Sequence, residues 1–155
     1  MQSLAPRSTL AGKRGTGIMK GLEQIGTRAY FRPTGVLTLA QGLALVAAAI
    51  RAARDLGVAD MLVDTTGASG FASPNAFERY ELGTSWADAA GPHLAVAFVI
   101  RPEMIDPQKL GAVVAQNRNA IVDVFGSEAE ALAWLDARVG PVHHNRRQRN
   151  RLDGD

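Results

Sequence analysis

The chain of 155 residues contains no cysteine. This absence excludes disulfide bridges, thiolate nucleophiles and cysteine-ligated metal sites, and it fits the reducing conditions of the cytosol. Histidine is scarce too, because His93 is the only one besides the adjacent pair His143 and His144. We expect only incidental metal affinity from that pair. The sequence therefore predicts no metal site, no cofactor and a cytoplasmic location.

Long apolar runs are missing as well. The longest, residues 43–50, is far shorter than the roughly 20 residues that a membrane-spanning helix needs. The basic N-terminus lacks the apolar segment of a secretory signal. We therefore expect no membrane span. The composition, with 46% hydrophobic and 21% charged residues, is typical of one globular domain with a core of its own.

Acidic residues are absent from residues 1–20, which carry four basic ones. Residues 141–155 carry four arginines against two aspartates, so the two ends together carry a charge of +6. The whole chain carries +2, which leaves −4 for residues 21–140. This distribution predicts no specific nucleic-acid binding, because a nucleic-acid-binding domain usually has a basic face rather than basic ends.

The composition divides the chain into three parts. Residues 1–20 and 140–155 have no apolar periodicity, and we predict a disordered N-terminal extension and a disordered basic tail. Residues 21–139 form the predicted α/β domain. Met19 is a second candidate start, so the sequence leaves open whether residues 1–18 are translated.

The hydrophobic pattern of the middle part alternates between strands and helices. Strands at residues 26–31 and 35–37, joined by a turn, are predicted to pair as an antiparallel hairpin. The later alternation of strands with helices predicts parallel pairing. The further predicted strands are residues 58–64, 94–100 and 120–125, and the predicted helices are residues 39–56, residues 74–89 and two that start at Asp106-Pro107 and Ser127. The sequence thus predicts an α/β fold with a mixed, mainly parallel sheet and about four helices.

Capping residues mark where these helices begin. Thr38 and Gln41 have the spacing of a capping box, in which each side chain bonds the backbone amide of the other. Ser73 is predicted to cap the second helix, with Pro74 at its first position. A second capping box is predicted at Ser127.

The central strand is expected at a short apolar run, Met61 to Val63, that ends at Asp64. A run that is apolar at successive positions is typical of a strand covered on both faces. Asp64, Thr65 and Thr66 then lie at the carboxyl end of that strand, where open α/β sheets bind ligands and partners. We expect Asp64 to accept backbone amides in the turn. The loop of residues 65–72 and the helix after it form the predicted working face.

Three stretches carry a resemblance to a known family. They are Gly35-Val36-Leu37-Thr38 before the first helix, Met61-Leu62-Val63-Asp64 as the central strand, and Val122-Asp123-Val124-Phe125 with the helix of residues 127–135. Over roughly residues 24–138, this order of elements resembles the anti-sigma-factor antagonist superfamily, the STAS domains, and in particular its SpoIIAA-like branch. The resemblance implies a STAS-like fold for residues 21–139, and it implies little about function because one fold serves many functions.

The same resemblance implies a place for a regulatory phosphorylation. In antagonist members, a phosphorylatable serine follows the central strand within an Asp-Ser-Ser-Gly-like motif. Ser73 is the serine near that place here, but residues 71–76 lack the acidic residue and the glycine. Ser73 is therefore a candidate phospho-acceptor, and a plain helix cap is the favoured interpretation.

The sequence offers no nucleophile–base pair, no paired carboxylates and no complete nucleotide-binding glycine loop. We therefore expect no enzyme. The leading hypothesis is a non-enzymatic regulatory or adaptor module that docks a protein partner through the predicted working face. The residues predicted to bind that partner are Asp64, Thr65, Thr66, Phe71, Ser73 and Asn75.

The alternative is a carrier of a small hydrophobic, lipid-like ligand, because STAS-like domains include relatives of lipid carriers. The ligand would lie between the sheet and the helix that bears Phe77, Tyr80 and Trp86, although aromatic residues at helical spacing are usually core. Phe71 would then act as a lid, whereas a partner-binding module would expose it as an anchor. The sequence names neither partner nor ligand, and it leaves open whether the chain forms a homodimer.

Overall fold

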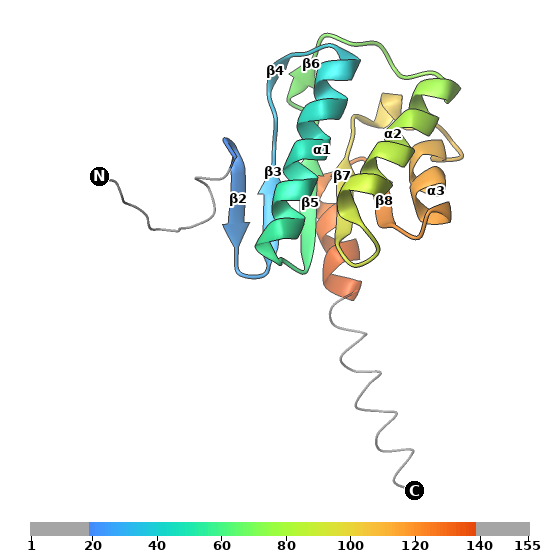
Figure 1. Ribbon diagram of the computed structural model, residues 1–155. Coiled ribbons are helices and arrows are strands. Elements are labelled where there is room, and N and C mark those ends of the chain that lie inside the picture. The colour runs from blue at the N-terminus through green and yellow to red at the C-terminus, as the bar shows by residue number, and fades with distance from the viewer. Residues whose placement is uncertain (1–18, 139–155) are drawn as a thin grey trace, which may run out of the picture.

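A five-stranded sheet forms the centre of the structure, a computed structural model that describes residues 19–138 (Figure 1). Along the sheet, the strands lie in the order β2 (Leu22–Ile25), β3 (Arg28–Phe31), β5 (Asp60–Asp64), β7 (Ala95–Val99) and β8 (Ile121–Phe125). β2 pairs antiparallel with β3, and the other neighbours in this sheet are parallel. The predicted mixed, mainly parallel α/β sheet is therefore confirmed.

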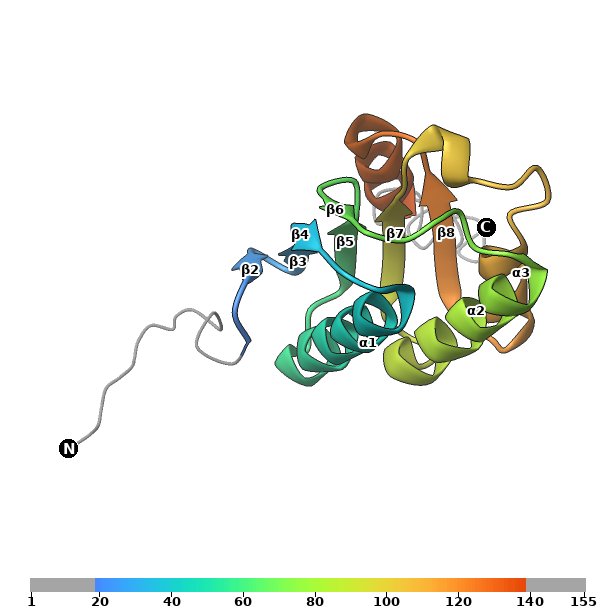
Figure 2. The same ribbon diagram turned by 90° about the horizontal axis from the view of Figure 1, so that it is seen from above.

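Helices cover both faces of this sheet. They are α1 (Leu39–Leu56), α2 (Ala76–Ala90), α3 (Leu110–Asn117) and a last helix that occupies residues 128–138. Figure 2 shows α1, α2 and α3 on one face and the last helix on the other. A short 3-10 helix, η2 (Pro102–Met104), follows β7. The four α-helices of the described residues agree with the number predicted from the sequence.

The central strand β5 is buried on both faces, as its sequence predicts. Met61 and Val63 pack into the core on the side of α1 and α2. Leu62 points to the opposite face and packs there with Ala131 and Leu135 of the last helix. Because side chains alternate along a strand, one apolar run supplies both layers of the core.

The predicted N-terminal hairpin is wrong in its choice of strands. We expected residues 26–31 to pair with residues 35–37, but the hairpin is formed by β2 and β3. β4 (Gly35–Val36) instead pairs in parallel with β6 (Ala68–Ser69), in a separate two-stranded sheet. The loop of residues 65–72 thus contains a short strand that ties it to the segment before α1.

The two predicted caps of the first helices have opposite outcomes. The Gln41 amide donates to the Thr38 hydroxyl at 3.0 Å, and the Thr38 amide donates to the Gln41 side chain at 2.9 Å, so that capping box is confirmed. Ser73 does not cap α2, because Asn75 does so, in a capping box with Glu78 at 2.8 and 2.9 Å. Asn75 has an acidic side chain three residues further on, which Ser73 lacks.

The predicted start of the third helix is also displaced. We expected the helix to begin at Asp106-Pro107, but α3 begins at Leu110. Residues 107–109 form a turn that ends with Lys109 at a φ of +51°. The Asp106 carboxylate still accepts from the Leu110 amide, at 3.1 and 3.2 Å, so it satisfies the helix start from further away.

The capping box predicted at Ser127 is half present. The Glu130 amide donates to the Ser127 hydroxyl at 3.2 Å, whereas the Glu130 carboxylate accepts from the Gly126 amide instead of the Ser127 amide.

No helix within residues 19–138 is long and apolar enough to cross a membrane. Most of the predicted N-terminal extension and the whole basic tail, with His143 and His144, lie outside the described residues.

Candidate functional site

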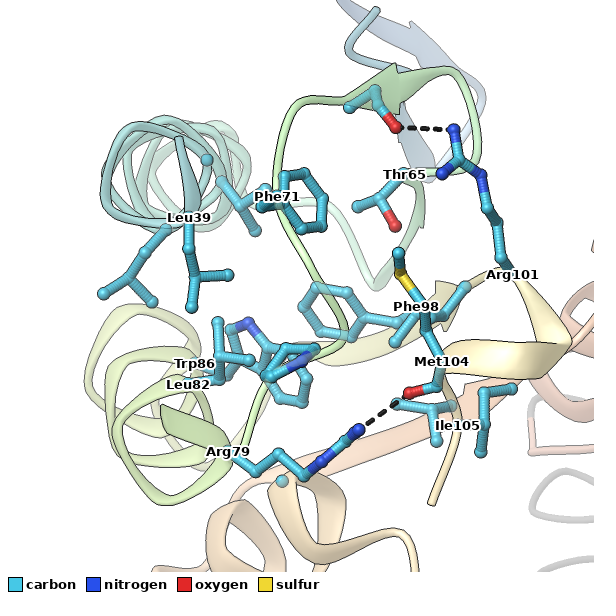
Figure 3. A pocket seen from close by; sticks show the side chains of 18 of the residues that line it. Leu39, Thr65, Phe71, Arg79, Leu82, Trp86, Phe98, Arg101, Met104 and Ile105 are labelled. Atoms are coloured by element: carbon cyan, nitrogen blue, oxygen red, sulfur yellow. Dashed lines mark hydrogen bonds between the residues drawn. The ribbon is translucent and has the colours of Figure 1, made fainter. Parts of the chain in front are cut away.

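An apolar cavity of about 100 Å³ lies against α1 and α2, on the sheet face that these helices cover (Figure 3). Segments far apart in the sequence converge on it. The lining includes Leu39, Leu43 and Val46 of α1, Leu82 and Trp86 of α2, Phe98 of β7, Phe71 of the loop, and Met104 and Ile105 after β7. The mostly apolar lining is suited to an apolar ligand or ligand group.

Two stacked aromatic rings form one wall of the cavity. The ring centroids of Trp86 on α2 and Phe98 on β7 lie 4.1 Å apart, with an angle of 24° between the ring planes. Both side chains are buried. Aromatic pairs of this kind contribute about 0.5–1.5 kcal/mol beyond the burial of their surface. The pair therefore fixes α2 against the sheet directly beside the cavity.

Phe71 faces the cavity from the loop and is half-buried. The backbone around it is held closely, since the Leu37 amide donates to the Ser69 carbonyl at 2.7 Å. Gly70 has a φ of +104°, and a Cβ at this position would lie 2.7 Å from the Leu37 carbonyl oxygen. Only glycine tolerates both that conformation and that approach. The position of Phe71 is thus set by the close contact of residues 69 and 70 with Leu37, before α1.

Two arginines line the cavity and differ in their partners. Arg79 forms an ion pair with Asp106 at 3.2 Å. Nη2 of Arg101 donates to the carbonyl oxygens of Thr66 and Ala68, at 3.2 and 2.8 Å. Within residues 19–138, Arg101 forms no ion pair. Arg101 therefore fastens the loop to the end of β7, and its charge has no ion-pair partner in the described part of the chain.

α1 has a gap in its cavity-lining face at Gly42. Gly42 lines the cavity, and a Cβ added there would have no heavy atom within 4 Å. Residues three and four apart share one face of a helix, so this Cβ would start on the face of Leu39 and Val46. The missing side chain therefore leaves space open on the helix face that borders the cavity.

The structure brings two of the six predicted binding residues, Thr65 and Phe71, to the cavity. The Thr65 hydroxyl donates to the Val99 carbonyl at 3.2 Å. Asp64 and Thr66 are not part of the lining. The Asp64 carboxylate accepts from the Thr66 amide at 2.9 Å and from the Thr66 hydroxyl at 2.6 Å, which confirms its predicted role in the turn.

Ser73 and Asn75 lie just before α2 and are also outside the cavity lining. Ser73 is exposed, and its hydroxyl accepts from Nη2 of Arg79 at 2.9 Å. Asn75 is the cap of α2. The structure thus gives Ser73 a contact with an arginine instead of the predicted capping role, and its phosphorylation stays a prediction.

The three aromatic residues of α2 differ in burial. Trp86 is 5% exposed, whereas Phe77 is 69% exposed and Tyr80 is 48% exposed. The expectation that they belong to the core is confirmed for Trp86 and wrong for the other two. All buried residues of α2 lie from Gly83 onwards, so the first half of the helix contributes none of its side chains fully to the core.

The sequence pattern does not single out several residues of the cavity. Arg101 lies two residues after β7, and its place beyond the carboxyl end of a parallel strand is a signal that identifies it as a candidate. Met104 and Ile105 reach the cavity through the turn of η2, which has no strong signature in the sequence. Gly42 contributes open space because it has no side chain, and a pattern of apolar residues does not reveal such space.

A polar cluster lies where the end of β3 meets the start of the last helix. Arg32 donates two hydrogen bonds to the Glu128 carboxylate, at 2.7 and 3.0 Å. These bonds from Arg32 are the main reason that the pKa of Glu128 is lowered from 4.5 to about 2. In the part of the chain that the structure describes, no group of three or more potential metal ligands occurs. The cluster therefore acts as an ionic link between the sheet and the last helix.

No protein-family model matches the chain, and no curated protein matches it. A solved structure described as "NMR Structure of the protein TM1081" is similar to the chain at 13% sequence identity, with a TM-score of 0.39. The similarity covers 86% of this chain and 96% of that chain. A likeness at this level identifies neither a family nor a function.

Proposed function

We propose that the protein is a non-enzymatic carrier of a small hydrophobic ligand, which binds in the cavity against α1 and α2 with Phe71 as its lid. The observation that carries this proposal is an apolar cavity with Phe71 half-buried at its edge. Moving an apolar group from water into such a space is favourable in proportion to the apolar area removed from water.

The volume of the cavity limits the size of the ligand. About 100 Å³ is of the order of the engineered apolar cavity of about 150 Å³ that binds benzene. It is smaller than the pockets of about 300–1,000 Å³ that enclose drug-sized molecules. The proposed ligand group is therefore a short alkyl chain or one small ring. A longer lipid-like chain would require Phe71 and its loop to move.

Filling the gap at Gly42 tests the proposal. Leucine at this position would extend from the cavity-lining face of α1 and take up space that the ligand needs. Ala44→Leu is the matched control, because Ala44 lies on the same helix but is exposed. The probe is hexanamide, an uncharged molecule with a short alkyl chain, and its dissociation constant is measured by NMR titration of each folded variant.

We expect the parent protein and Ala44→Leu to bind hexanamide with the same affinity. Gly42→Leu should bind it at least about ten-fold more weakly, which corresponds to the roughly 1–3 kcal/mol that an overpacked site costs. Equal binding by Gly42→Leu and the parent would place the probe elsewhere, and no binding by the parent would remove the basis of the proposal.

A protein partner is the second candidate, supported by the exposed aromatic side chains of α2. Phe77 and Tyr80 expose 69% and 48% of their surface, and exposed aromatic residues are frequent anchors of protein interfaces. Phe71→Ala and Phe77→Ala separate the two candidates. A ligand carrier should lose affinity for hexanamide with Phe71→Ala and keep it with Phe77→Ala. A docking module should lose its partner in a pull-down with Phe77→Ala, with hexanamide binding unchanged.

We also propose that the chain is a STAS-like domain of the SpoIIAA-like kind and that it works in the cytoplasm. The support is the order of its elements, an antiparallel hairpin at the sheet edge followed by alternating helices and parallel strands, with four α-helices among the described residues. A regulatory role and a homodimer are compatible with this arrangement, and both remain part of the proposal.

A further inference from the structure

The cavity lining carries more positive than negative charge. It includes three cations, Arg79, Arg101 and Lys109, and one acid, Asp106. Asp106 pairs with Arg79 at 3.2 Å, and Lys109 lies 3.4 Å from Asp123 outside the lining. Among the described residues, Arg101 is the lining cation that forms no ion pair.

Arg101 also has hydrogen-bond donors to spare. A guanidinium carries five N–H donors, and here Nη2 uses its bonds on the carbonyl oxygens of Thr66 and Ala68. Nε and Nη1 donate to no atom of residues 19–138. The two carbonyl bonds hold the planar group in place, so the remaining donors are oriented in advance. Because the side chain is half-buried, its unbalanced charge is less well solvated than in open water, which favours binding of an anion.

We infer that the ligand of the cavity is a short aliphatic or aromatic carboxylate, with its apolar part in the cavity and its carboxylate on the free donors of Arg101. This inference rests on the proposed function and names the chemical class of its ligand. The apolar walls select the carbon chain, and Arg101 selects the charged end. Arginine suits this task because its charge persists at any physiological pH, and a free N–H of Nη1 or Nε can donate a charge-assisted hydrogen bond to a carboxylate oxygen.

A pair of probes tests the charge preference separately from the cavity. Hexanoate and hexanamide have the same carbon chain and differ in charge, so the ratio of their dissociation constants measures the contribution of the carboxylate. By NMR titration at neutral pH, the parent protein should bind hexanoate about ten-fold more tightly, as expected for hydrogen bonds to a charged group. Arg101→Met should bring this ratio close to one. Arg51→Met, which removes an exposed arginine of α1, should leave the ratio unchanged.

The ratio also distinguishes binding from a structural role. If Arg101 only fastened the loop, Arg101→Met would weaken both probes alike, the ratio would stay as in the parent, and the inference would be overturned. Asp106→Asn gives a second, independent variant. It removes the acid that the described residues contribute to the lining but keeps a side-chain oxygen to accept from the Leu110 amide, and it should raise the ratio.

Three further outcomes would contradict the inference in different ways. Equal binding of hexanoate and hexanamide by the parent would overturn it and leave the proposed function intact. Binding of neither probe would overturn both. Hexyl phosphate, titrated in the same way, should not bind more tightly than hexanoate, and a clear preference for it would overturn the assignment of a carboxylate.

Discussion

Arg28 on β3 lies opposite Asp60 on β5 and donates two hydrogen bonds to its carboxylate, at 2.8 and 3.2 Å. Asp60 is 4% exposed, and Asp136 of the last helix accepts a third bond from Arg28 at 2.9 Å. The hydrogen bond to Asp60 is the main reason that the pKa of Arg28 is raised above its ordinary value. One arginine thus joins two strands of the sheet to the last helix.

We predict that Asp60→Asn lowers the free energy of unfolding by about 3–5 kcal/mol, because it removes one partner of a buried ion pair. Asp136→Asn is the matched control, since Asp136 has a side chain that is 69% exposed. That substitution should cost less than about 1 kcal/mol, as exposed ion pairs do. Urea unfolding at neutral pH measures both. Equal costs for the two variants would contradict this description of the pair.

The Arg32–Glu128 pair should make stability depend on pH. Glu128 has a pKa of about 2 in the folded protein against an ordinary value of 4.5, so the folded state binds its proton less readily than the unfolded state does. The stabilisation is therefore complete above the ordinary pKa and is lost as the pH falls from 4.5 through about 2. Its size should stay below about 1 kcal/mol, because the Arg32 side chain is 44% exposed.

Glu128→Gln provides the measurement of this pH dependence. Urea unfolding at about pH 6 should show the parent protein to be more stable than the variant, and at about pH 3 the difference should shrink. A difference that grows at the lower pH would show that the folded protein does not hold the Glu128 pKa below its ordinary value.

The same substitution should have opposite effects at two helical glycines. A Cβ at Gly42 meets nothing within 4 Å, so Gly42→Ala should raise the free energy of unfolding by about 0.5–1 kcal/mol through better helix propensity. A Cβ at Gly83 would collide with the Gly111 carbonyl oxygen of α3 and lie 2.8 Å from the Val114 Cβ. Gly83→Ala should therefore lower the free energy of unfolding by about 1–3 kcal/mol. Thermal or chemical unfolding of both variants checks the sign, and stabilisation by Gly83→Ala would contradict the close packing of α2 on α3.

The cap of α2 can be assigned by two alanine substitutions. Asn75→Ala should cost about 1 kcal/mol, because it leaves the Glu78 amide without its acceptor. Ser73→Ala should change the free energy of unfolding by less than about 0.5 kcal/mol, as most exposed positions do. Urea unfolding measures both costs. A larger cost for Ser73→Ala than for Asn75→Ala would show that Ser73 is the cap.

The sequence predicts those elements whose signals are local. The capping box of α1 lies within four residues, and the burial of Met61, Leu62 and Val63 follows from their unbroken apolar run. β2 is missed because Leu22 is its one buried residue, so it shows no alternating pattern. The wrong cap at Ser73 shows the limit of a single signal, since Pro74 favoured that position while the pair Asn75 and Glu78 was equally available in the sequence.

The candidate site depends on contacts between distant segments, which a local pattern does not contain. The sequence predicts the wrong partner for β4, because its true partner, β6, lies more than thirty residues away in the chain. Thr65 and Phe71 were found because they follow the central strand, where ligands commonly bind. The helical spacing of Trp86 is typical of a core residue, but nothing in the sequence indicates that space remains beside its ring, which stacks on Phe98.

A ligand in the cavity would touch Trp86, which makes this residue a direct reporter of binding. The chain has two tryptophans, and the other, Trp134, packs against Phe125 with ring centroids 5.6 Å apart. Trp134→Phe therefore leaves Trp86 as the single fluorescent tryptophan. We predict that titrating this variant with hexanamide changes the Trp86 emission in a saturable manner, and that adding Gly42→Leu shifts the change to a hexanamide concentration at least about ten-fold higher. An emission that stays constant, or that changes equally with Gly42→Leu present, would contradict the assignment of this cavity as the binding site.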